Sequence, residues 1–386
     1  MSAAPVSAPD EPARGTGPES RGHDAFRSRR VFGSLDGLRG LSIAAVVWHH
    51  TQPEGQGLGA YVPAARLGFL GVDLFFVLSG FLIVTLLLRE RERSGTIALR
   101  DFYVRRSLRI FPLYYGVLLA FTLLYWARVD PRAETFRADL PYLALYLSNW
   151  IATPSLAIAW SLAAEEQFYL VWPPVERWLR RYAVPLIVVL IAASELIQLG
   201  WLDPLLASAF GWTRDEPRML RETTFAPICL GVLLAHVLHR RESFERVAAL
   251  WGHPLAAPLA LLALLVVPQA FPGDIRGWPR LLVQLLMLNL LASAVVRDDH
   301  ALARFYAWRP LARLGAVSYG VYLLHHIGIG VAERASGLVS RTLWELPLVP
   351  FVLGGLCAFA LAELSFRCYE RPFLKLKGRW GGSAHG

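Results

Sequence analysis

Apolar segments long enough to form membrane-spanning helices follow one another along most of this chain. Charged residues make up only 18% of its 386 residues, against about 25% in an average soluble domain. A helix that crosses the hydrocarbon core of a bilayer needs about 20 mostly apolar residues. The sequence therefore predicts an all-α integral membrane protein. The candidate segments cover residues 35–51, 67–88, 107–127, 141–153, 160–176, 183–202, 223–239, 254–271, 279–296, 311–331 and 343–366.

Basic residues gather in the short connections between these segments, where the positive-inside rule places them on the cytoplasmic side. These connections lie at residues 27–30, 89–106, 177–181, 240–246, 297–309 and 367–379. If all of them face the cytoplasm, residues 141–176 cross the bilayer only once, and part of this region is broken or re-entrant. We therefore predict a bundle of about ten transmembrane helices with one broken or re-entrant segment and both termini in the cytoplasm. The same distribution accounts for the net charge of +9 without nucleic acid binding.

The two ends of the chain differ from the rest in composition. Residues 1–33 are rich in Pro, Gly, Ser and charge and hold no apolar stretch, so we expect a disordered cytoplasmic tail and no signal peptide. Residues 34–376 form the predicted membrane domain, and residues 377–386 form a short cytoplasmic tail. The 3 cysteines are too few and too scattered for a disulfide framework or a zinc site, and we expect no metal ion.

Ionisable side chains inside apolar helices are costly, so they are candidates for function. In the first segment, Arg39 and His50 are eleven residues apart. This spacing places them within about 20° of one helix face and about 16 Å apart along the axis. Asp73 interrupts the second apolar segment. It is expected to balance a histidine or arginine of a neighbouring helix, and a purely structural ion pair is an equally good interpretation.

Two further charged pairs lie at the start of the third segment and in the region of the predicted break. Arg106 and Arg109 are three residues apart and share a helix face. Two guanidinium groups so placed can grip phosphates, although basic residues also belong at a cytoplasmic boundary. Glu165 and Glu166 lie within an apolar run. Either one faces a cavity and pairs with an arginine, or both lie exposed near a helix end.

Near the end of the chain, Ser318, Tyr322 and His325 fall on one helix face. Taken alone, this group favours a structural polar network over a binding site.

Together these segments resemble the membrane acyltransferase-3 family, whose members acylate cell-surface glycans and some antibiotics. The resemblance covers roughly residues 34–375 and departs from the common pattern at Gly320 and His326. The motifs that carry it are Leu35-Asp36-Gly37-Leu38-Arg39-Gly40 with His50, Gly71-Val72-Asp73-Leu74-Phe75-Phe76-Val77-Leu78-Ser79-Gly80-Phe81, Arg106-Ser107-Leu108-Arg109, Trp160-Ser161-Leu162 with Glu165-Glu166-Gln167-Phe168-Tyr169, Ser318-Tyr319 through His325, and Tyr369-Glu370-Arg371-Pro372-Phe373.

The resemblance implies a role for several of these residues. His50 matches the essential histidine of the family, and Arg39 matches the arginine of the same helix. Arg106 and Arg109 match the paired arginines linked to the acyl donor. Glu165 matches the first glutamate of the family's Glu-x-Gln-Phe-Tyr signature. Glu166, Tyr322 and His325 are further candidate site residues within the matching motifs.

These assignments predict an O-acyltransferase that uses acyl-CoA, with acetyl-CoA as the expected co-substrate. The acceptor is a hydroxyl of a carbohydrate or of a secondary metabolite such as a macrolide. An alcohol hardly ionises near neutrality, so a base must take its proton as the new bond forms, and a neutral histidine suits that task. We expect His50 to be this base, with Asp73 or Glu165 orienting it or stabilising its charged form.

Other functions are compatible with buried charges in a membrane bundle. The main alternative is a transporter or flippase for a glycan or lipophilic metabolite, which would move its substrate without covalent change. His49 followed by Glu54 is also faintly similar to the His-x4-Asp motif of glycerolipid acyltransferases, although the surrounding context is missing. A non-catalytic envelope scaffold is a third possibility. The expected partners are the lipid bilayer and a hydroxyl-bearing acceptor, and the sequence does not predict an oligomeric state.

Overall fold

The computed structural model describes residues 18–29, 32–52, 63–210, 225–271, 275–337, 344, 346 and 348–376, and it contains no strand within these residues. The predicted all-α class is therefore confirmed for the part of the chain that the structure describes. The long helices are α2 (Gly33–Thr51), α3 (Gly71–Ser94), α4 (Leu99–Trp126), α6 (Ala159–Trp178), α7 (Ala183–Gln198), α13 (Trp278–Val296), α16 (Ser318–Gly337) and α18 (Leu348–Ser365). The shorter ones are α1 (Pro18–Ser28), α5 (Pro131–Ala144), α8 (Asp203–Phe210), α10 (Ala226–His239), α11 (Arg241–Trp251), α12 (Ala256–Val266), α14 (Ala303–Tyr306), α15 (Arg309–Ala316) and α19 (Arg371–Leu376).

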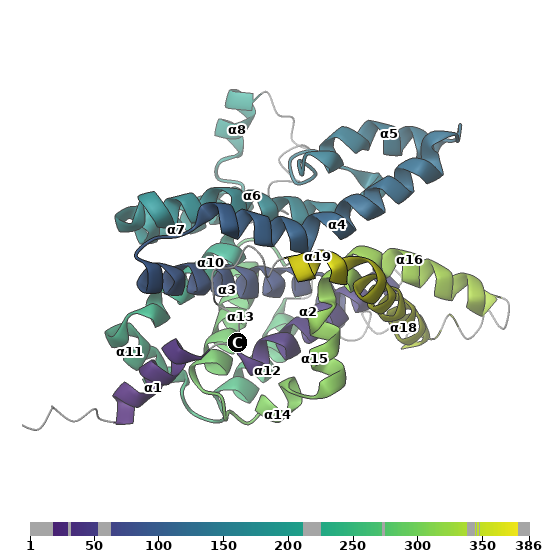
Figure 1. The fold of residues 1–386 in the computed structure, drawn as a ribbon. Helices are drawn as coiled ribbons and strands as arrows, with labels where there is room; N and C mark the ends of the chain where they lie inside the picture. The colour runs from purple at the N-terminus through teal and green to yellow at the C-terminus, as the bar shows by residue number, and fades with distance from the viewer. Residues whose placement is uncertain are drawn as a thin grey trace, which may run out of the picture.

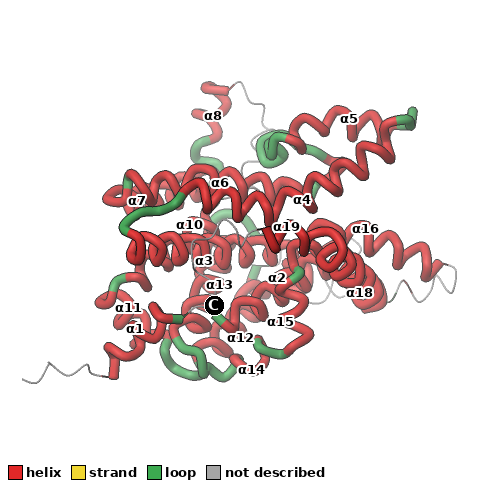
Figure 2. Tube along the Cα trace, in the orientation of Figure 1, coloured by secondary structure: helices red, strands yellow, loops and turns green. Residues whose placement is uncertain are grey.

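Helix α3 lies at the centre of the bundle and packs against α2, α6, α10 and α13 (Figure 1). Helices α16 and α18 lie side by side, and both contact α2. Helix α4 runs across the other face of the bundle and packs against α5 and against α19 near the C-terminus (Figure 2). Because α2, α3, α4, α6 and α16 converge in this way, polar side chains from distant parts of the sequence meet in the interior.

The chain is a multi-pass membrane protein by the length and composition of its helices. Five helices among the described residues are long and apolar enough to cross a bilayer, and the number rises to 8 if each of three sharply bent helix pairs is one span. This range lies below the predicted count of about ten. Part of the difference has a simple cause, because α10 is only 14 residues long and α6 carries three glutamates.

Residues 141–176 do not form one continuous helix. Helix α6 is continuous from Ala159 to Trp178, whereas residues 145–158 contain only a short 3-10 turn at Pro154–Leu156. Hydrogen bonds between polar side chains hold this irregular stretch against the helices on either side of it. Asp139 accepts hydrogen bonds from the backbone and the hydroxyl of Ser155, and the amides of Asn149 and Gln167 bond each other reciprocally. The apolar run 141–153 is therefore a packed connection and not a span.

The disordered tail predicted for residues 1–33 is wrong for residues 18–28, which form helix α1. Phe26 on this helix is buried. The buried guanidinium of Arg89 donates hydrogen bonds to the carbonyls of Phe26 and Arg29 and lies over the ring of Phe26. This arginine holds the end of α1 against α3. Residues 1–17 and 377–386 lie outside the described residues.

Close packing of α3 against its neighbours depends on glycine at positions 71 and 80. A Cβ at Gly80 would lie 2.1 Å from the carbonyl oxygen of Ile228 on α10, and one at Gly71 would lie 2.4 Å from that of Ser42 on α2. The hydroxyl of Ser79, next to Gly80, faces the cavity between α3, α4 and α6.

Candidate active site

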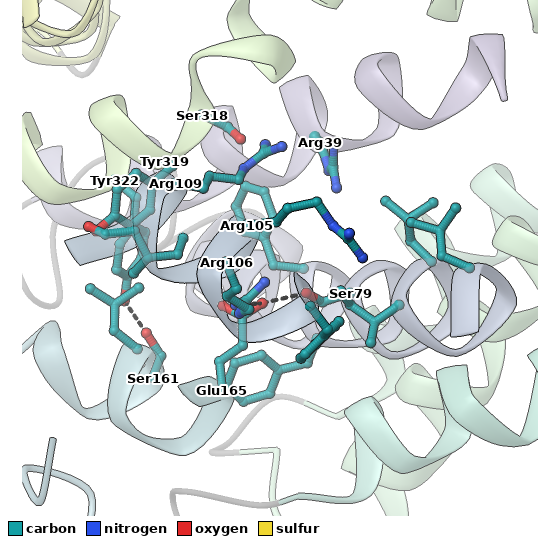
Figure 3. A pocket seen from close by; sticks show the side chains of 18 of the residues that line it. Arg39, Ser79, Arg105, Arg106, Arg109, Ser161, Glu165, Ser318, Tyr319 and Tyr322 are labelled. Carbon is teal, nitrogen blue, oxygen red and sulfur yellow. Dashed lines mark hydrogen bonds and ion pairs between the residues drawn. The ribbon is translucent and has the colours of Figure 1, made fainter. Parts of the chain in front are cut away.

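A cavity with arginines on its wall lies between α2, α3, α4, α6 and α16 (Figure 3). Apolar side chains of α3 form much of the remaining wall. All five helices contribute polar groups, and α4 contributes most of the positive charge. The polar lining residues are Arg39, Ser79, Glu90, Arg105, Arg106, Arg109, Ser161, Glu165, Ser318, Tyr319 and Tyr322.

Two carboxylates of α6 neutralise Arg106. Its Nε and Nη2 atoms donate to Oε1 of Glu166 at 3.0 and 2.7 Å, and Nη2 lies 3.4 Å from Oε1 of Glu165. The guanidinium also lies over the ring of Tyr169, 3.4 Å from its centroid. The expectation that one of the adjacent glutamates pairs with an arginine is therefore confirmed. Arg106 is held by the protein and has little capacity left for a ligand.

Three more arginines line the cavity. Arg109 lines the cavity with an exposed side chain, and it forms no hydrogen bond or ion pair with any residue that the structure describes. Arg39 has only a long contact of 3.5 Å with Asp36, and Arg105 lies 3.6 Å from Glu90. Three guanidinium groups therefore present positive charge to one cavity, which suits an anionic ligand with several oxygen atoms.

Ser79, Glu165 and Tyr169 form a hydrogen-bonded group on the cavity wall beneath Arg106. The hydroxyl of Ser79 bonds Oε1 of Glu165 and the hydroxyl of Tyr169, and Tyr169 donates to the same carboxylate oxygen at 2.8 Å. Glu165 therefore satisfies its charge within α3, α4 and α6. It is not the residue that contacts His50.

His50 lies at the other end of α2 from Arg39, in contact with two histidines of α16. Its ring centroid is 4.7 Å from that of His325 and 4.6 Å from that of His326. Nδ1 of His50 lies 2.9 Å from the carbonyl oxygen of Val46 and 3.2 Å from Nε2 of His325. We call His50, His325 and His326 the histidine cluster.

Backbone carbonyls fix the tautomers in this cluster. A carbonyl oxygen can only accept, so Nδ1 of His325, 2.5 Å from the carbonyl of Tyr322, carries a proton. A neutral His325 then has a lone pair on Nε2, which faces Nδ1 of His50. Nδ1 of His50 also faces a carbonyl and carries the proton of that ring. A neutral His50 is therefore left with an unprotonated Nε2, the atom that a general base requires.

Tyr322 connects the cavity to the histidine cluster. Its side chain lines the cavity, and its hydroxyl bonds Oγ of Ser161 at 2.6 Å and the carbonyl of Ile158 at 3.0 Å. Its ring centroid lies 5.8 Å from that of His325, one turn further along α16. The structural polar network favoured for this face is present, and it forms the wall between the two halves of the site.

Asp73 lies apart from both halves. Its carboxylate accepts two hydrogen bonds from Arg280 at 2.9 and 2.8 Å and a third from Gln284 at 2.8 Å, all from α13. The interpretation of Asp73 as a buried structural ion pair thus describes its contacts. Asp73 or Glu165 was expected to orient His50. In the structure the side chain that contacts His50 is His325, and neither carboxylate lies there.

The structure brings Arg39, Arg106, Arg109, Glu165 and Tyr322 to the same cavity. Sequence reasoning missed further residues of the site, which are Ser79, Arg105, Ser161, Tyr169 and His326. Arg105 and His326 each adjoin a residue that was singled out. The others gave no signal beyond their place in motifs of the resemblance.

The chain is similar to known O-acetyltransferases over most of its length. Over 378 residues the chain is 28% identical to the peptidoglycan O-acetyltransferase OatA of Listeria monocytogenes, an alignment that covers 90% of this chain and 56% of that protein. It is 29% identical over 371 residues to the putative peptidoglycan O-acetyltransferase YrhL of Bacillus subtilis, covering 89% of this chain and 55% of that protein. It is also 29% identical over 371 residues to the O-acetyltransferase OatA of Staphylococcus aureus, covering 90% and 58%.

The chain thus spans little more than half the length of these curated relatives. No solved structure matches it. The family model described as an acyltransferase domain matches residues 32–365, which include both halves of the site. The chain therefore belongs to the membrane acyltransferase-3 family.

Proposed function

We propose that the chain transfers an acetyl or short acyl group from acyl-CoA to a hydroxyl group of a glycan. The observation that carries this proposal is the arrangement along α2 and α16 of an arginine-lined cavity and a histidine with a free ring nitrogen. The cavity supplies positive charge for an anionic donor, and His50 supplies a base for the acceptor. The names of the relatives favour a glycan over a macrolide-type metabolite as the acceptor.

Arg39, Arg105 and Arg109 are suited to hold the phosphates of coenzyme A or the carbonyl of its thioester. The cavity has a volume of about 240 Å³, below the range of about 300–1,000 Å³ that is usual for drug-sized ligands. It therefore accommodates one end of a coenzyme A thioester, and the rest of the donor extends beyond its mouth. Since acyl-CoA is made in the cytoplasm, this donor places the arginine end of α2 on the cytoplasmic side, with both termini of the chain there.

The chemical step uses the free Nε2 of His50. The acceptor hydroxyl attacks the thioester carbonyl while Nε2 takes its proton. The tetrahedral intermediate then collapses, the carbon–sulfur bond breaks, and the coenzyme A thiolate takes up the proton from the imidazolium. The products are the ester and free coenzyme A. The carbonyl of Val46, with Nε2 of His325 beside it, keeps the other proton of His50 on Nδ1, and so keeps Nε2 available for each cycle.

The separation of the two halves sets a condition on the reaction. Arg39 and His50 lie about 16 Å apart along α2, and His50 does not line the cavity. The acyl-carrying arm of the donor must therefore pass Tyr322 and Ser161, whose hydroxyls bond each other. We propose that this contact opens when the donor binds.

Label transfer tests the proposal. Membranes that contain the wild-type chain, His50→Ala or the matched control His49→Ala are incubated with radiolabelled acetyl-CoA and peptidoglycan fragments or other extracted glycans. We expect alkali-labile label in the glycan with the wild type and with His49→Ala, and none with His50→Ala. A wild-type chain that is folded in the membrane yet transfers no label from any acyl-CoA would refute the proposal and favour the transporter. Normal transfer by His50→Ala would refute the role of His50.

A further inference from the structure

The histidine cluster has the composition and geometry of a metal-binding site. His50, His325 and His326 each offer one ring nitrogen, and these nitrogens lie within 4.8 Å of one another. His325 is fully buried, His50 is partly buried and His326 is exposed, so an ion can enter from the side of His326. We propose that these three side chains form a binding site for a divalent transition-metal ion of the zinc type.

The hydrogen bonds of the cluster support this proposal independently of its composition. Histidines that bind a metal almost always donate their other ring N–H to a carbonyl, a carboxylate or water, which fixes the ring and leaves the second nitrogen to the metal. Nδ1 of His50 faces the carbonyl of Val46, and Nδ1 of His325 faces that of Tyr322. Two of the three rings are therefore already held in the tautomer that presents Nε2 as a ligand.

The distances require only side-chain adjustment. Zinc–nitrogen bonds are about 2.0–2.1 Å long, so nitrogens around a tetrahedral ion lie about 3.3 Å apart. The three rings therefore have to close in by roughly 1.5 Å, and the ring of His50 has to turn so that Nε2 and not Nδ1 faces the ion. The χ2 torsion of histidine is soft and permits this turn. On binding, Nε2 of His325 exchanges its contact with Nδ1 of His50 for the metal. Three imidazole ligands suit Zn²⁺, Co²⁺ or Ni²⁺ and leave a fourth position for water.

A metal at this site has a consequence that rests on the proposed function. It occupies the lone pair of Nε2 of His50, the same lone pair that takes the proton of the acceptor. We therefore infer that zinc-type ions inhibit acyl transfer by competing for His50. Loss of His326 removes a metal ligand without removing the base, so the two roles of the cluster can be separated.

Binding is tested with Co²⁺ and the purified full-length chain in detergent, carrying no polyhistidine tag. Tetrahedral nitrogen ligation gives Co²⁺ intense visible absorption bands, and Zn²⁺ should displace the Co²⁺ and abolish them. We expect these bands with the wild type and with His49→Ala, and their loss with His326→Ala. Loss of a residue that only orients a metal ligand lowers metal affinity roughly 10- to 100-fold. Because His326 is itself a ligand in this proposal, the Co²⁺ affinity of His326→Ala should fall by more than that. An absence of tetrahedral bands in the wild type, or equal binding by His326→Ala, would overturn the proposal.

Transfer assays with Zn²⁺ and with a chelator test the inhibition separately. We expect Zn²⁺ to inhibit the wild type and His49→Ala, and to inhibit His326→Ala much less at the same concentration. If the chelator abolishes acyl transfer, the metal is required for the reaction, and the proposal that it inhibits the reaction is overturned. Metal binding is read from the Co²⁺ spectrum and acyl transfer from the label. If no metal binds, the acyl transfer result therefore still stands. Conversely, a chain that transfers no acyl group can still show the metal site.

Discussion

Replacing Asp73 with asparagine should destabilise the bundle without altering the histidine cluster. Asp73 and Arg280 have 1% and 6% of their side-chain surface exposed, so their charges are almost completely removed from solvent. Asparagine keeps the shape and one acceptor oxygen but removes the negative charge. Breaking a buried ion pair by removing one partner costs about 3–5 kcal/mol. We expect Asp73→Asn to fall at the lower end, about 3 kcal/mol, because its amide oxygen still accepts one hydrogen bond.

The double variant Asp73→Asn with Arg280→Gln separates a structural role from a chemical one. Removing both members of a buried pair is often nearly neutral, so the double variant should recover most of the stability that either single variant loses. Thermal denaturation in detergent, followed by the amount of monodisperse protein that survives heating, measures the stability of all four chains. Label transfer by the surviving protein measures activity, which we expect to be near wild type in the double variant.

Two results would refute this reasoning. The first is an Asp73→Asn variant that is as stable as the wild type and yet inactive. The second is a double variant that regains stability but not activity. Either outcome would support the catalytic role that the sequence suggested for Asp73. Its carboxylate would then act on the reaction and not only pair with Arg280.

Three further changes test other contacts. His325→Ala should lower kcat about 10- to 100-fold with little change in KM, because it removes the side chain that packs against the ring of His50 and orients it, and His325→Gln should recover part of the rate; equal rates for all three chains would contradict this. Arg109→Ala should raise KM for acyl-CoA about 10- to 150-fold, the value of a charge-assisted hydrogen bond, while an unchanged KM would remove Arg109 from donor binding. Gly80→Ala should lower stability by about 1–3 kcal/mol, since its Cβ would lie 2.1 Å from a carbonyl of α10. A Cβ at Gly330 would have nothing within 4 Å, so Gly330→Ala should not lower stability. Equal melting temperatures for Gly80→Ala and Gly330→Ala would refute the packing argument.

Features encoded within one helix could be predicted from the sequence. The apolar runs gave the helical membrane class. The adjacent Glu165 and Glu166 in an apolar run offered an ion pair with an arginine as one of two interpretations, because an apolar helix leaves such groups few other partners. The structure confirms that pairing between α4 and α6.

Features that depend on which helices meet could not be predicted in this way. Asp73 and Arg280 are 207 positions apart, and nothing in either segment specifies the other. Likewise, His326 could be identified as a site residue only from its contact with His50 on α2. A break within residues 141–176 was predicted, but the contacts that fix the irregular backbone were not, because the apolar run at 141–153 gives no sign of the hydrogen bonds of Asp139 and Asn149.

Helices α2 and α16 together set the distance between donor and base. Helix α2 carries Arg39 on the cavity and His50 in the histidine cluster. Helix α16 carries Tyr322 on the cavity and His325 in the cluster, one turn apart. One residue inserted between Tyr322 and His325 would turn the histidine by about 100° and move it about 1.5 Å along the axis. Such a change should abolish transfer while leaving acyl-CoA binding intact, because the arginines belong to α2 and α4. Loss of both activities together would mean that the two halves are not separate sites joined by these helices.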